Sequence, residues 1–195
     1  MFRNFIEAII FRIPHGLLSR FRILIYRRLG MTVGKKNRFE RGRIRNIHQI
    51  KMGDYNAFTE GWFLWPLKTD DHRIKICIGN NNYFNRNLMI DACNLVEIGN
   101  HNMFGPDIYI TDSNHSYGKG INPHSAPMQK GKVKIGNYCW IGAKAVILKD
   151  VELGDYCVVA AGAVVTKSFP DGSIIAGIPA NIKPNLINNY LRNNK

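Results

Sequence analysis

The feature that most constrains the fold is a six-residue repeat between Ile135 and Val165. An aliphatic residue returns at every sixth position of this stretch: Ile135, Ile141, Ile147, Leu153, Val159 and Val165. Neither an α-helix nor a single strand repeats in this way, because their side chains recur with periods of 3.6 and 2 residues. Three hexads make eighteen residues, so the pattern predicts three short strands per coil and a chain that then stacks on itself.

The residues around this ladder fit a stack of coils. Four positions after the first five ladder residues come small or modest side chains: Cys139, Ala145, Val151, Cys157 and Ala163. Weaker sets of hexads begin at Met52, Ile78 and Ile98, and slips in phase between the sets predict loops at 66–73 and 116–132. A single coil cannot bury its own aliphatic side chains, so stacked coils are expected to share one continuous core.

The N-terminal segment carries most of the charge. Of the net charge of +13, residues 1–51 supply +11, with 13 Lys and Arg against Glu7 and Glu40. Apolar stripes on both sides of Pro14–Gly16 predict two helices within residues 1–29, separated by a break. Two compatible roles follow: a cap on the repeat domain or its oligomer, which we favour, or contact with an anionic membrane. No nucleic-acid partner is expected, since no helix-turn-helix or RNA-binding signature accompanies the charge.

The cysteines and the absence of targeting signals bear on the compartment. Cys77, Cys93, Cys139 and Cys157 show no CxxC and no zinc spacing, so no metal site is expected. Cys139 and Cys157 lie one coil apart and are expected to be reduced core residues, with a disulfide as the alternative. Neither a signal peptide nor an apolar run of about 18 residues occurs. We therefore expect a cytoplasmic protein, with a peripheral position at the inner face of the membrane as an option.

Five motifs occur in a fixed order: IGNNNYFNRN (78–87), IGNHNMFGPDIYITDSNH (98–115), IGNYCWIGAKAVI (135–147), LGDYCVVAAGAVVTK (153–167) and AGIPA (176–180). Together they resemble the hexapeptide-repeat acyltransferases over roughly residues 44–183, and most closely the sugar O-acetyltransferases of cell-surface polysaccharide biosynthesis.

The resemblance implies an all-β fold. It places a left-handed parallel β-helix at 31–180. The residues themselves predict the protruding loop 116–132, a basic amphipathic helical extension at 1–30 and a polar tail with one short helix at 181–195. The left hand rests on the resemblance alone, because ordinary parallel crossovers are right-handed.

The resemblance also implies an acetyl-CoA-dependent O-acetyltransferase acting on a sugar hydroxyl, and a homotrimer whose active sites lie between subunits. His115, at the end of ITDSNH, matches the general base of the family. An imidazole, with a usual pKa near 6.5, can take the hydroxyl proton at neutral pH, an effect of about 10²–10⁴-fold. Transfer is expected to be direct, without an acyl-enzyme. Of the other histidines, only His124 is a further candidate for the cleft.

Three residues are candidates for the acceptor side of the site, and of these Asn85 and Trp140 match positions of the family's site. The amide of Asn85 suits a sugar hydroxyl because it both donates and accepts hydrogen bonds, although a role in turning a corner is the alternative. Asp112 is a candidate to orient His115 or to bind the acceptor, although residues three apart on a strand point in different directions. Trp140 matches the aromatic residue that lines the tunnel where pantetheine and acceptor meet, with packing at a subunit contact as the alternative.

Further residues match the donor side. Ala143 and Ala161 occupy positions whose backbone N–H groups bind the pantetheine amides in the family. Thr166 and Lys167 match the position near the CoA nucleotide, where a lysine can meet phosphate as a point charge. Lys183 is a similar candidate, although its surroundings lack the arginine of a common family ending. Acetyl-CoA is thus the expected co-substrate, and no metal is required.

Two other functions remain open from the residues alone. The same scaffold suits N-acetylation of an amino sugar, a nucleotide sugar or an antibiotic. A non-catalytic β-helix that serves as a scaffold is the second, although the joint presence of His115, Trp140 and Lys167 argues against it. The basic N-terminus suggests a lipid-linked or membrane-proximal sugar as acceptor. The identity of the sugar, its hydroxyl and the acyl chain length do not follow from the sequence.

Overall fold

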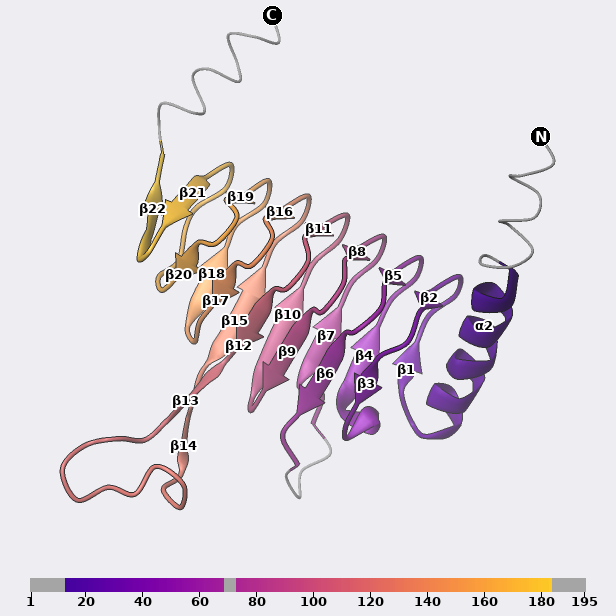
Figure 1. Ribbon diagram of the computed structural model, residues 1–195, viewed down its shortest axis with the longest axis horizontal. Coiled ribbons are helices and arrows are strands. Elements are labelled where there is room, and N and C mark those ends of the chain that lie inside the picture. The colour runs from indigo at the N-terminus through magenta and orange to yellow at the C-terminus, as the bar shows by residue number, and fades with distance from the viewer. Residues whose placement is uncertain (1–12, 69–72, 184–195) are drawn as a thin grey trace, which may run out of the picture.

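The computed structural model describes residues 13–68 and 73–183, which form a prism of stacked β-coils with a helix across one end (Figure 1). Each coil contributes one short strand to each of three sheets. The first sheet consists of β1 (Thr32–Val33), β4 (Ile50–Met52), β7 (Ile76–Ile78), β10 (Leu95–Ile98), β15 (Lys132–Ile135) and β18 (Val151–Leu153). The second sheet begins with β2 (Arg38–Phe39), β5 (Ala57–Phe58), β8 (Tyr83–Phe84), β11 (Met103–Phe104), β16 (Trp140–Ile141) and β19 (Val158–Val159). The third sheet consists of β3 (Arg43–Ile44), β6 (Phe63–Pro66), β9 (Met89–Ala92), β12 (Tyr109–Thr111), β17 (Val146–Ile147) and β20 (Val164–Val165).

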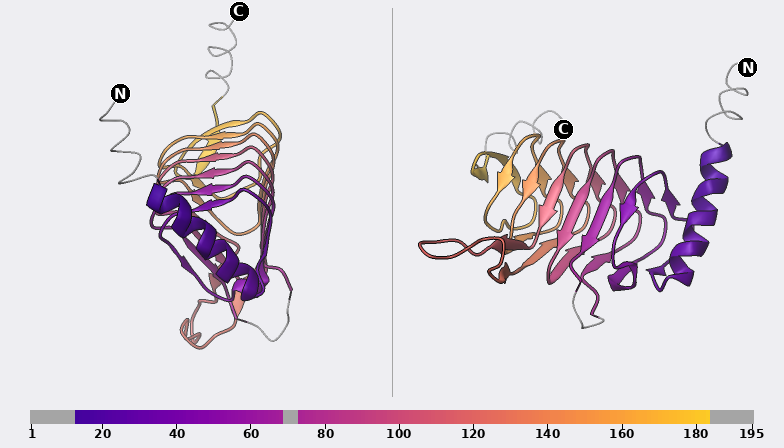
Figure 2. Two further views of the ribbon diagram at one scale, coloured as in Figure 1. Left: turned by 90° about the vertical axis from the view of Figure 1, so that its right-hand side faces the viewer. Right: turned by 60° about the horizontal axis from the view of Figure 1, so that its bottom comes forward.

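The strands pair in parallel with their counterparts in the next coil. Trp140 lies opposite Val158, and Val146 opposite Val164, so the register advances by eighteen residues as the hexads predict. Seen end-on, the coils lie behind one another with little offset (Figure 2). The second sheet ends with β21 (Ile174–Gly177), which is parallel to β19, and with β22 (Ala180–Ile182), which is antiparallel to β21. The fold is therefore a parallel β-helix closed by a short hairpin.

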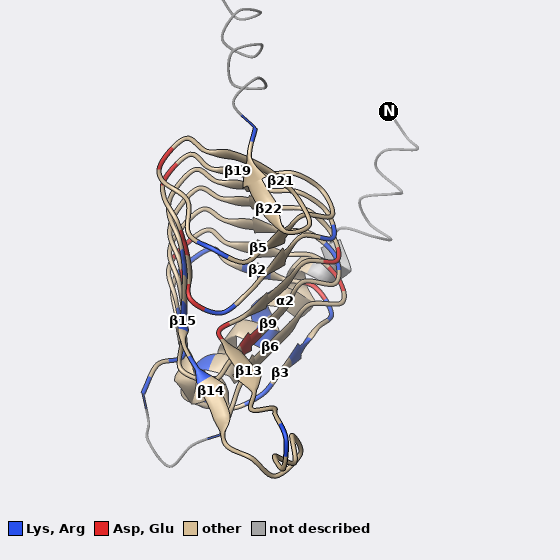
Figure 3. Ribbon diagram, turned by 90° about the vertical axis from the view of Figure 1, so that its left-hand side faces the viewer, with Lys and Arg blue, Asp and Glu red and all other residues tan. Residues whose placement is uncertain are grey.

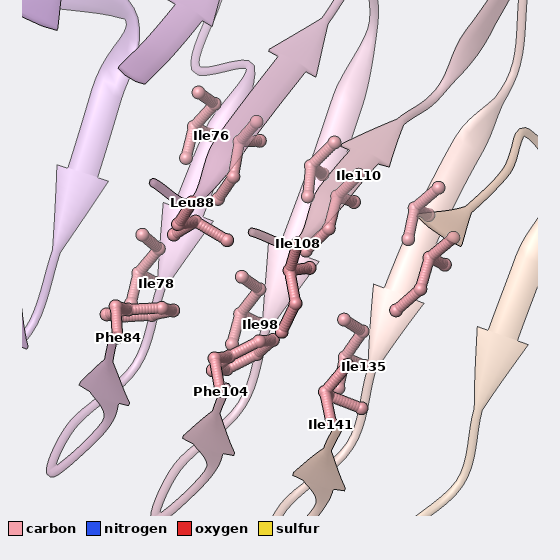
Figure 4. Packing of buried hydrophobic residues seen from close by; sticks show 14 of the residues in the cluster. Ile76, Ile78, Phe84, Leu88, Ile98, Phe104, Ile108, Ile110, Ile135 and Ile141 are labelled. Atoms are coloured by element: carbon pink, nitrogen blue, oxygen red, sulfur yellow. The ribbon is translucent and has the colours of Figure 1, made fainter. Parts of the chain in front are cut away.

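The hexad side chains form the core. All six ladder residues from Ile135 to Val165 are at most 1% exposed, and so are Ala145, Val151, Cys157 and Ala163, while Cys139 is 2% exposed. Inward-facing side chains stack in columns, one per sheet (Figure 4). In the second sheet the column begins with four phenylalanines: Phe39, Phe58, Phe84 and Phe104. The predicted core is confirmed, and all four cysteines are free, as expected.

Asparagines hold the corner between the first and second sheets. The buried Asn82 side chain donates to the Gly99 carbonyl of the next coil, and Asn102 does the same to Gly136. Outside them, Asn100 accepts a backbone N–H bond from Asn80 and donates to Asn137. The expectation that the asparagines shape turns is correct for these residues.

The N-terminal helix α2 (Ile13–Arg28) covers the open end of the first coil. The break expected at Pro14–Gly16 is wrong, because α2 runs through these residues. Proline is tolerated in a first helical turn, where its missing N–H has no partner to lose. The other helix expected there falls on residues 1–12, outside the described part.

Two boundaries differ from the sequence-based prediction. A complete coil, β1–β3, precedes the hexads that begin at Met52 and lies within the predicted domain 31–180; Arg and Lys surround its few apolar residues and obscure the repeat. The protruding loop is a hairpin of β13 (Ser113–His115) and β14 (Met128–Lys130), so it starts before residue 116, and Lys132 belongs to β15. The expected tail at 181–195 begins inside β22, and its expected short helix falls on residues outside the described part.

The three outer faces differ in polarity. The first sheet presents charged and polar side chains outward, in the order Lys51, Cys77, Glu97, Lys134 and Glu152. Lys134 and Glu152 form an ion pair of 2.6 Å. The second sheet presents Tyr83, Met103, Trp140, Val158 and Ile174, and the third presents Phe63, Met89, Tyr109, Val146 and Val164. Two of the three faces are therefore largely apolar.

A 3-10 turn (η2, Ile47–Gln49) precedes β4. None of the described helices has the length and apolar character to cross a bilayer.

Candidate active site

The β13–β14 hairpin carries His115 away from the prism, at the corner between the third and first sheets (Figure 3). The two arms pair antiparallel, with His115 opposite Met128. The His115 side chain is exposed, and its Nδ1 lies 3.1 Å from the Pro123 carbonyl oxygen. Since a carbonyl only accepts, this bond requires the proton on Nδ1. In the neutral ring, Nε2 is then left as the basic nitrogen.

Asp112 anchors the base of this hairpin. Its side chain is fully buried, and its carboxylate accepts backbone N–H bonds from Cys93 (2.7 Å), Asn94 (2.7 Å) and Leu95 (2.5 Å). Its own carbonyl accepts from Gly131 at 2.7 Å, where the chain returns to the prism. Asp112 thus ties the preceding coil to the hairpin. The His115 ring bonds to Pro123 and the Asp112 carboxylate to backbone amides, so the two side chains are not paired, as their spacing of three residues on a strand suggested.

Asp91 lies near His115 and was not among the predicted site residues. It follows the buried Ile90 in β9, points outward and is half-buried, with the Tyr109 hydroxyl at 3.5 Å. Burial and the charge of Asp112 raise the pKa of the Asp91 carboxyl, while the Tyr109 hydrogen bond and the charge of His115 act to lower it. An acid at an outward strand position among apolar neighbours was the available signal for this residue.

We expect Asp91→Asn to raise the thermal midpoint at pH 7. A carboxyl whose pKa is raised in the folded state makes the folded protein bind more protons than the unfolded chain, so stability falls as pH rises. The increase in thermal midpoint caused by Asp91→Asn should therefore be absent below the usual carboxyl pKa of 3.8. It should grow as pH rises through the raised pKa of Asp91 in the folded protein. Thermal unfolding from about pH 4 to about pH 8 measures this. A lower midpoint at pH 7 would show instead that the ionised carboxylate is stabilised by its neighbours.

A second group of predicted residues lies at the corner between the second and third sheets. Asn85, Gly105, Gly142 and Ala160 occupy equivalent positions in successive coils, because each backbone N–H bonds to the strand of the next coil. Ala143 and Ala161 follow this column. Glycines fit because a Cβ on Gly105 would lie 2.6 Å from the Ala143 nitrogen, and one on Gly142 would lie 2.5 Å from the Ala161 nitrogen. Beyond Asn85 the corner is thus built of small residues.

Asn85 and Trp140 border this corner. The half-buried Asn85 has its Oδ1 turned to the backbone N–H of Arg86 (2.8 Å), which caps its own turn. Trp140, in β16, is 56% exposed on the apolar outer face of the second sheet, between Met103 and Val158. Such a large exposed indole suits contact with another chain or a ligand.

The remaining predicted donor-side residues lie elsewhere. Thr166 and Lys167 follow β20 at the far edge of the third sheet, and the Lys167 ammonium donates to Asn181 Oδ1 at 2.9 Å. Lys183 follows β22 and is exposed. Lys167 is thus near the terminal hairpin, six residues along the chain from Ala161.

One chain therefore holds two separate groups of predicted residues. His115 and Asp112 share the hairpin corner, while Asn85, Ala143 and Ala161 share another edge of the prism. Among the described residues, no three His, Cys, Asp or Glu side chains gather as metal ligands would. His124 lies in the hairpin loop, where its backbone N–H bonds to the Asn122 side chain.

Comparison with known proteins identifies the repeat. The family model described as bacterial transferase hexapeptide (six repeats) matches residues 132–167, which span β15 to β20. The galactoside O-acetyltransferase of Lactococcus lactis subsp. lactis (strain IL1403) is 34% identical over 105 residues, 54% of this chain and 50% of that protein. WbbJ of Escherichia coli (strain K12), a proposed lipopolysaccharide biosynthesis O-acetyl transferase, is 31% identical over 148 residues, 71% of this chain and 73% of WbbJ.

The fold agrees with these relatives. AntD, an N-acyltransferase from Bacillus cereus solved with dTDP and coenzyme A, superposes with a TM-score of 0.71 at 19% identity, over 87% of this chain and 96% of AntD. The match to the Lactococcus protein spans only half of that relative, whereas the match to WbbJ spans most of it. The stacked coils, the matching family model and the relatives converge on one assignment: this chain belongs to the hexapeptide-repeat transferase family.

Proposed function

We propose that the protein is an acetyl-CoA-dependent O-acetyltransferase with His115 as its general base. The observation that carries the proposal is the hydrogen bond from His115 Nδ1 to the Pro123 carbonyl, at 3.1 Å. It fixes the ring in the tautomer in which Nε2 can accept a proton, on an exposed arm that a substrate can reach.

The reaction follows from this tautomer. Nε2 takes the proton of the acceptor hydroxyl while the oxygen attacks the thioester carbonyl of acetyl-CoA. The C–S bond then breaks, the acetyl group stays on the acceptor oxygen, and the imidazolium returns its proton to the CoA thiolate. Every proton released in these steps is taken up again, so the reaction needs neither an acyl-enzyme nor a metal.

The corner of small residues is the proposed donor site. Ala143 and Ala161 follow the column of Gly105, Gly142 and Ala160, none of which carries a side chain larger than a methyl group. Amide groups of pantetheine can there meet backbone N–H groups. Trp140 is the proposed wall of this groove, and Thr166, Lys167 and Lys183 are proposed to lie toward the CoA phosphates. Asn85, at the head of the same column, is the proposed acceptor contact.

We infer that three left-handed prisms assemble as a homotrimer, which would complete the site. The polarity of the faces supports the trimer: the second and third sheets are largely apolar outside, whereas the first is charged. In a threefold assembly each subunit can bury two faces and leave one in water. The hairpin extends from the outer edge of the third sheet, so in such an assembly it would reach the second-sheet face of its neighbour, where Trp140 lies, and residues of two chains would come together.

A sugar hydroxyl in cell-surface polysaccharide assembly is the proposed acceptor. WbbJ and the Lactococcus relative are both named as O-acetyltransferases, with lipopolysaccharide biosynthesis and galactosides in their names. A lipid-linked sugar fits the basic N-terminal segment. The cytoplasm is the proposed compartment, and the four free cysteines suit it.

N-acylation of an amino or nucleotide sugar is the second candidate. It is favoured by the fold-level likeness to AntD, whose structure contains dTDP and coenzyme A.

Acetyl transfer to a panel of galactosides, nucleotide sugars and amino sugars tests the proposal. We expect CoA release that depends on a hydroxyl acceptor, with a product that mild alkali hydrolyses, because esters are labile under these conditions and amides are not. An alkali-stable product formed only with amino sugars would replace the proposal by the N-acyl candidate. CoA binding without transfer to any acceptor would favour a scaffold.

A further inference from the structure

The outer face of α2 is apolar although it faces away from the protein body. One side of the helix packs on the first coil through Ser19, Ile23 and Tyr26. Ile23 belongs to the buried core, and Tyr26 packs against it. The opposite side exposes five large apolar side chains, each 39–61% accessible: Leu17, Leu18, Phe21, Leu24 and Ile25. A contiguous apolar surface of this kind marks a contact site.

The orientation of the helix is fixed by specific bonds. Ser19 Oγ accepts the Phe39 backbone N–H at 2.8 Å, and Arg22 donates to the Phe39 carbonyl at 3.0 Å. Arg27 donates to the carbonyls of Val33 and Gly34, the latter at 2.8 Å. These bonds hold α2 by the side that carries Ser19 and Ile23. The apolar face is therefore turned outward by the way the helix is attached.

Cations border this face. A shallow groove between α2 and the first coil is lined by Arg20, Arg27, Lys35 and Lys36, together with Ile23 and Leu24, and no acidic residue lines it. Arg28 is exposed on the outer side of the helix, among the apolar residues. Within the described residues, α2 is the outermost layer at this end of the prism (Figures 1 and 2). A flat surface can therefore meet the apolar face and the cations together.

We propose that this end of the prism docks on an anionic phospholipid bilayer, with α2 lying in the plane of the interface. The apolar side chains would enter the boundary between headgroups and acyl chains, and the groove cations would meet lipid phosphates. A second copy of the chain is a poorer occupant. A twofold contact through this face would place the same cations of both copies together, with no acids in the groove to offset them. The inference stands on α2 and the first coil, and is independent of the acetyl transfer proposed for His115.

Co-sedimentation of the full chain with vesicles tests this docking. We expect strong binding to phosphatidylcholine vesicles that contain about 30% phosphatidylglycerol, weak binding to phosphatidylcholine alone, and loss of binding at high salt. Phe21→Glu should lower the bound fraction about tenfold. The matched control is Tyr156→Glu, which adds the same charge at an aromatic residue of equal exposure (60% against 61%) on a coil far along the prism. This control should bind as the wild type does.

A second variant keeps the test decisive if Phe21→Glu fails to fold. Lys35→Gln with Lys36→Gln lies on the first coil and should weaken binding to the anionic vesicles only. Wild-type binding that is equal for both vesicle types, or equal loss in Phe21→Glu and Tyr156→Glu, would overturn the proposal. A third result would also overturn it: the wild type binds no vesicles, and Phe21→Glu has a smaller particle mass than the wild type by light scattering. The apolar face would then be a contact within an oligomer.

Discussion

His115→Ala is expected to lower kcat by more than about 10²-fold while acetyl-CoA binding stays intact. The imidazole is the group proposed to take the hydroxyl proton, and alanine leaves water as the only base. The side chain is exposed on the hairpin arm and its one described hydrogen bond is to Pro123, so its removal should leave the coils folded. Steady-state kinetics on the best acceptor, together with calorimetric titration of acetyl-CoA, separates transfer from donor binding.

His124→Ala is the control for this experiment, because His124 lies in the same hairpin loop and is exposed. It should retain activity close to that of the wild type. Activity of His115→Ala within about threefold of the wild type would refute the general-base role. Equal losses in both variants would indicate that the hairpin as a whole, rather than one imidazole, was disturbed.

Phe84→Ala is expected to lower the free energy of unfolding by about 3–5 kcal/mol. The Phe84 ring is fully buried and stacks on Phe58 and Phe104, with centroid distances of 4.2 and 4.7 Å. Alanine would leave a void in the middle of the phenylalanine column, with stacking lost on both sides. Urea unfolding followed by circular dichroism gives the free energy.

Lys51→Ala is the control for the core substitution. Lys51 lies in β4 on the charged outer face of the first sheet and is exposed, so its truncation should change the free energy of unfolding by less than about 1 kcal/mol. A change in Phe84→Ala as small as that of the control would mean that the coils re-pack around the gap.

Much of the fold could be predicted because hexads are local. Each aliphatic residue of the ladder from Ile135 to Val165 indicates one inward-facing position in a coil, and all six are buried. The first coil lies inside the predicted domain 31–180, but its hexads were not recognised because Arg38 and Arg43 interrupt the apolar pattern around Phe39. The break at Pro14 was wrong because proline acts differently in a first turn and in a helix interior.

The candidate site could be predicted only in part. The resemblance to the family pointed to His115, but the partner of its Nδ1 is a carbonyl eight residues away, which any residue type could supply. The anchoring role of Asp112 could not be predicted, because a buried carboxylate that gathers three backbone amides looks, in sequence, like an acid near a base. How the His115 hairpin would reach the proposed donor groove depends on contacts between chains, which leave no spacing signature in one sequence.

The place where the hairpin leaves the prism bears on how such proteins diversify. β10 and β15 pair directly although the whole hairpin lies between them, with Ile98 opposite Ile135. The coils therefore continue as if residues 113–130 were absent, and closing a loop of different length changes the free energy only slowly. Insertions and deletions in this hairpin can therefore alter the surroundings proposed for the acceptor while the stack of coils is retained.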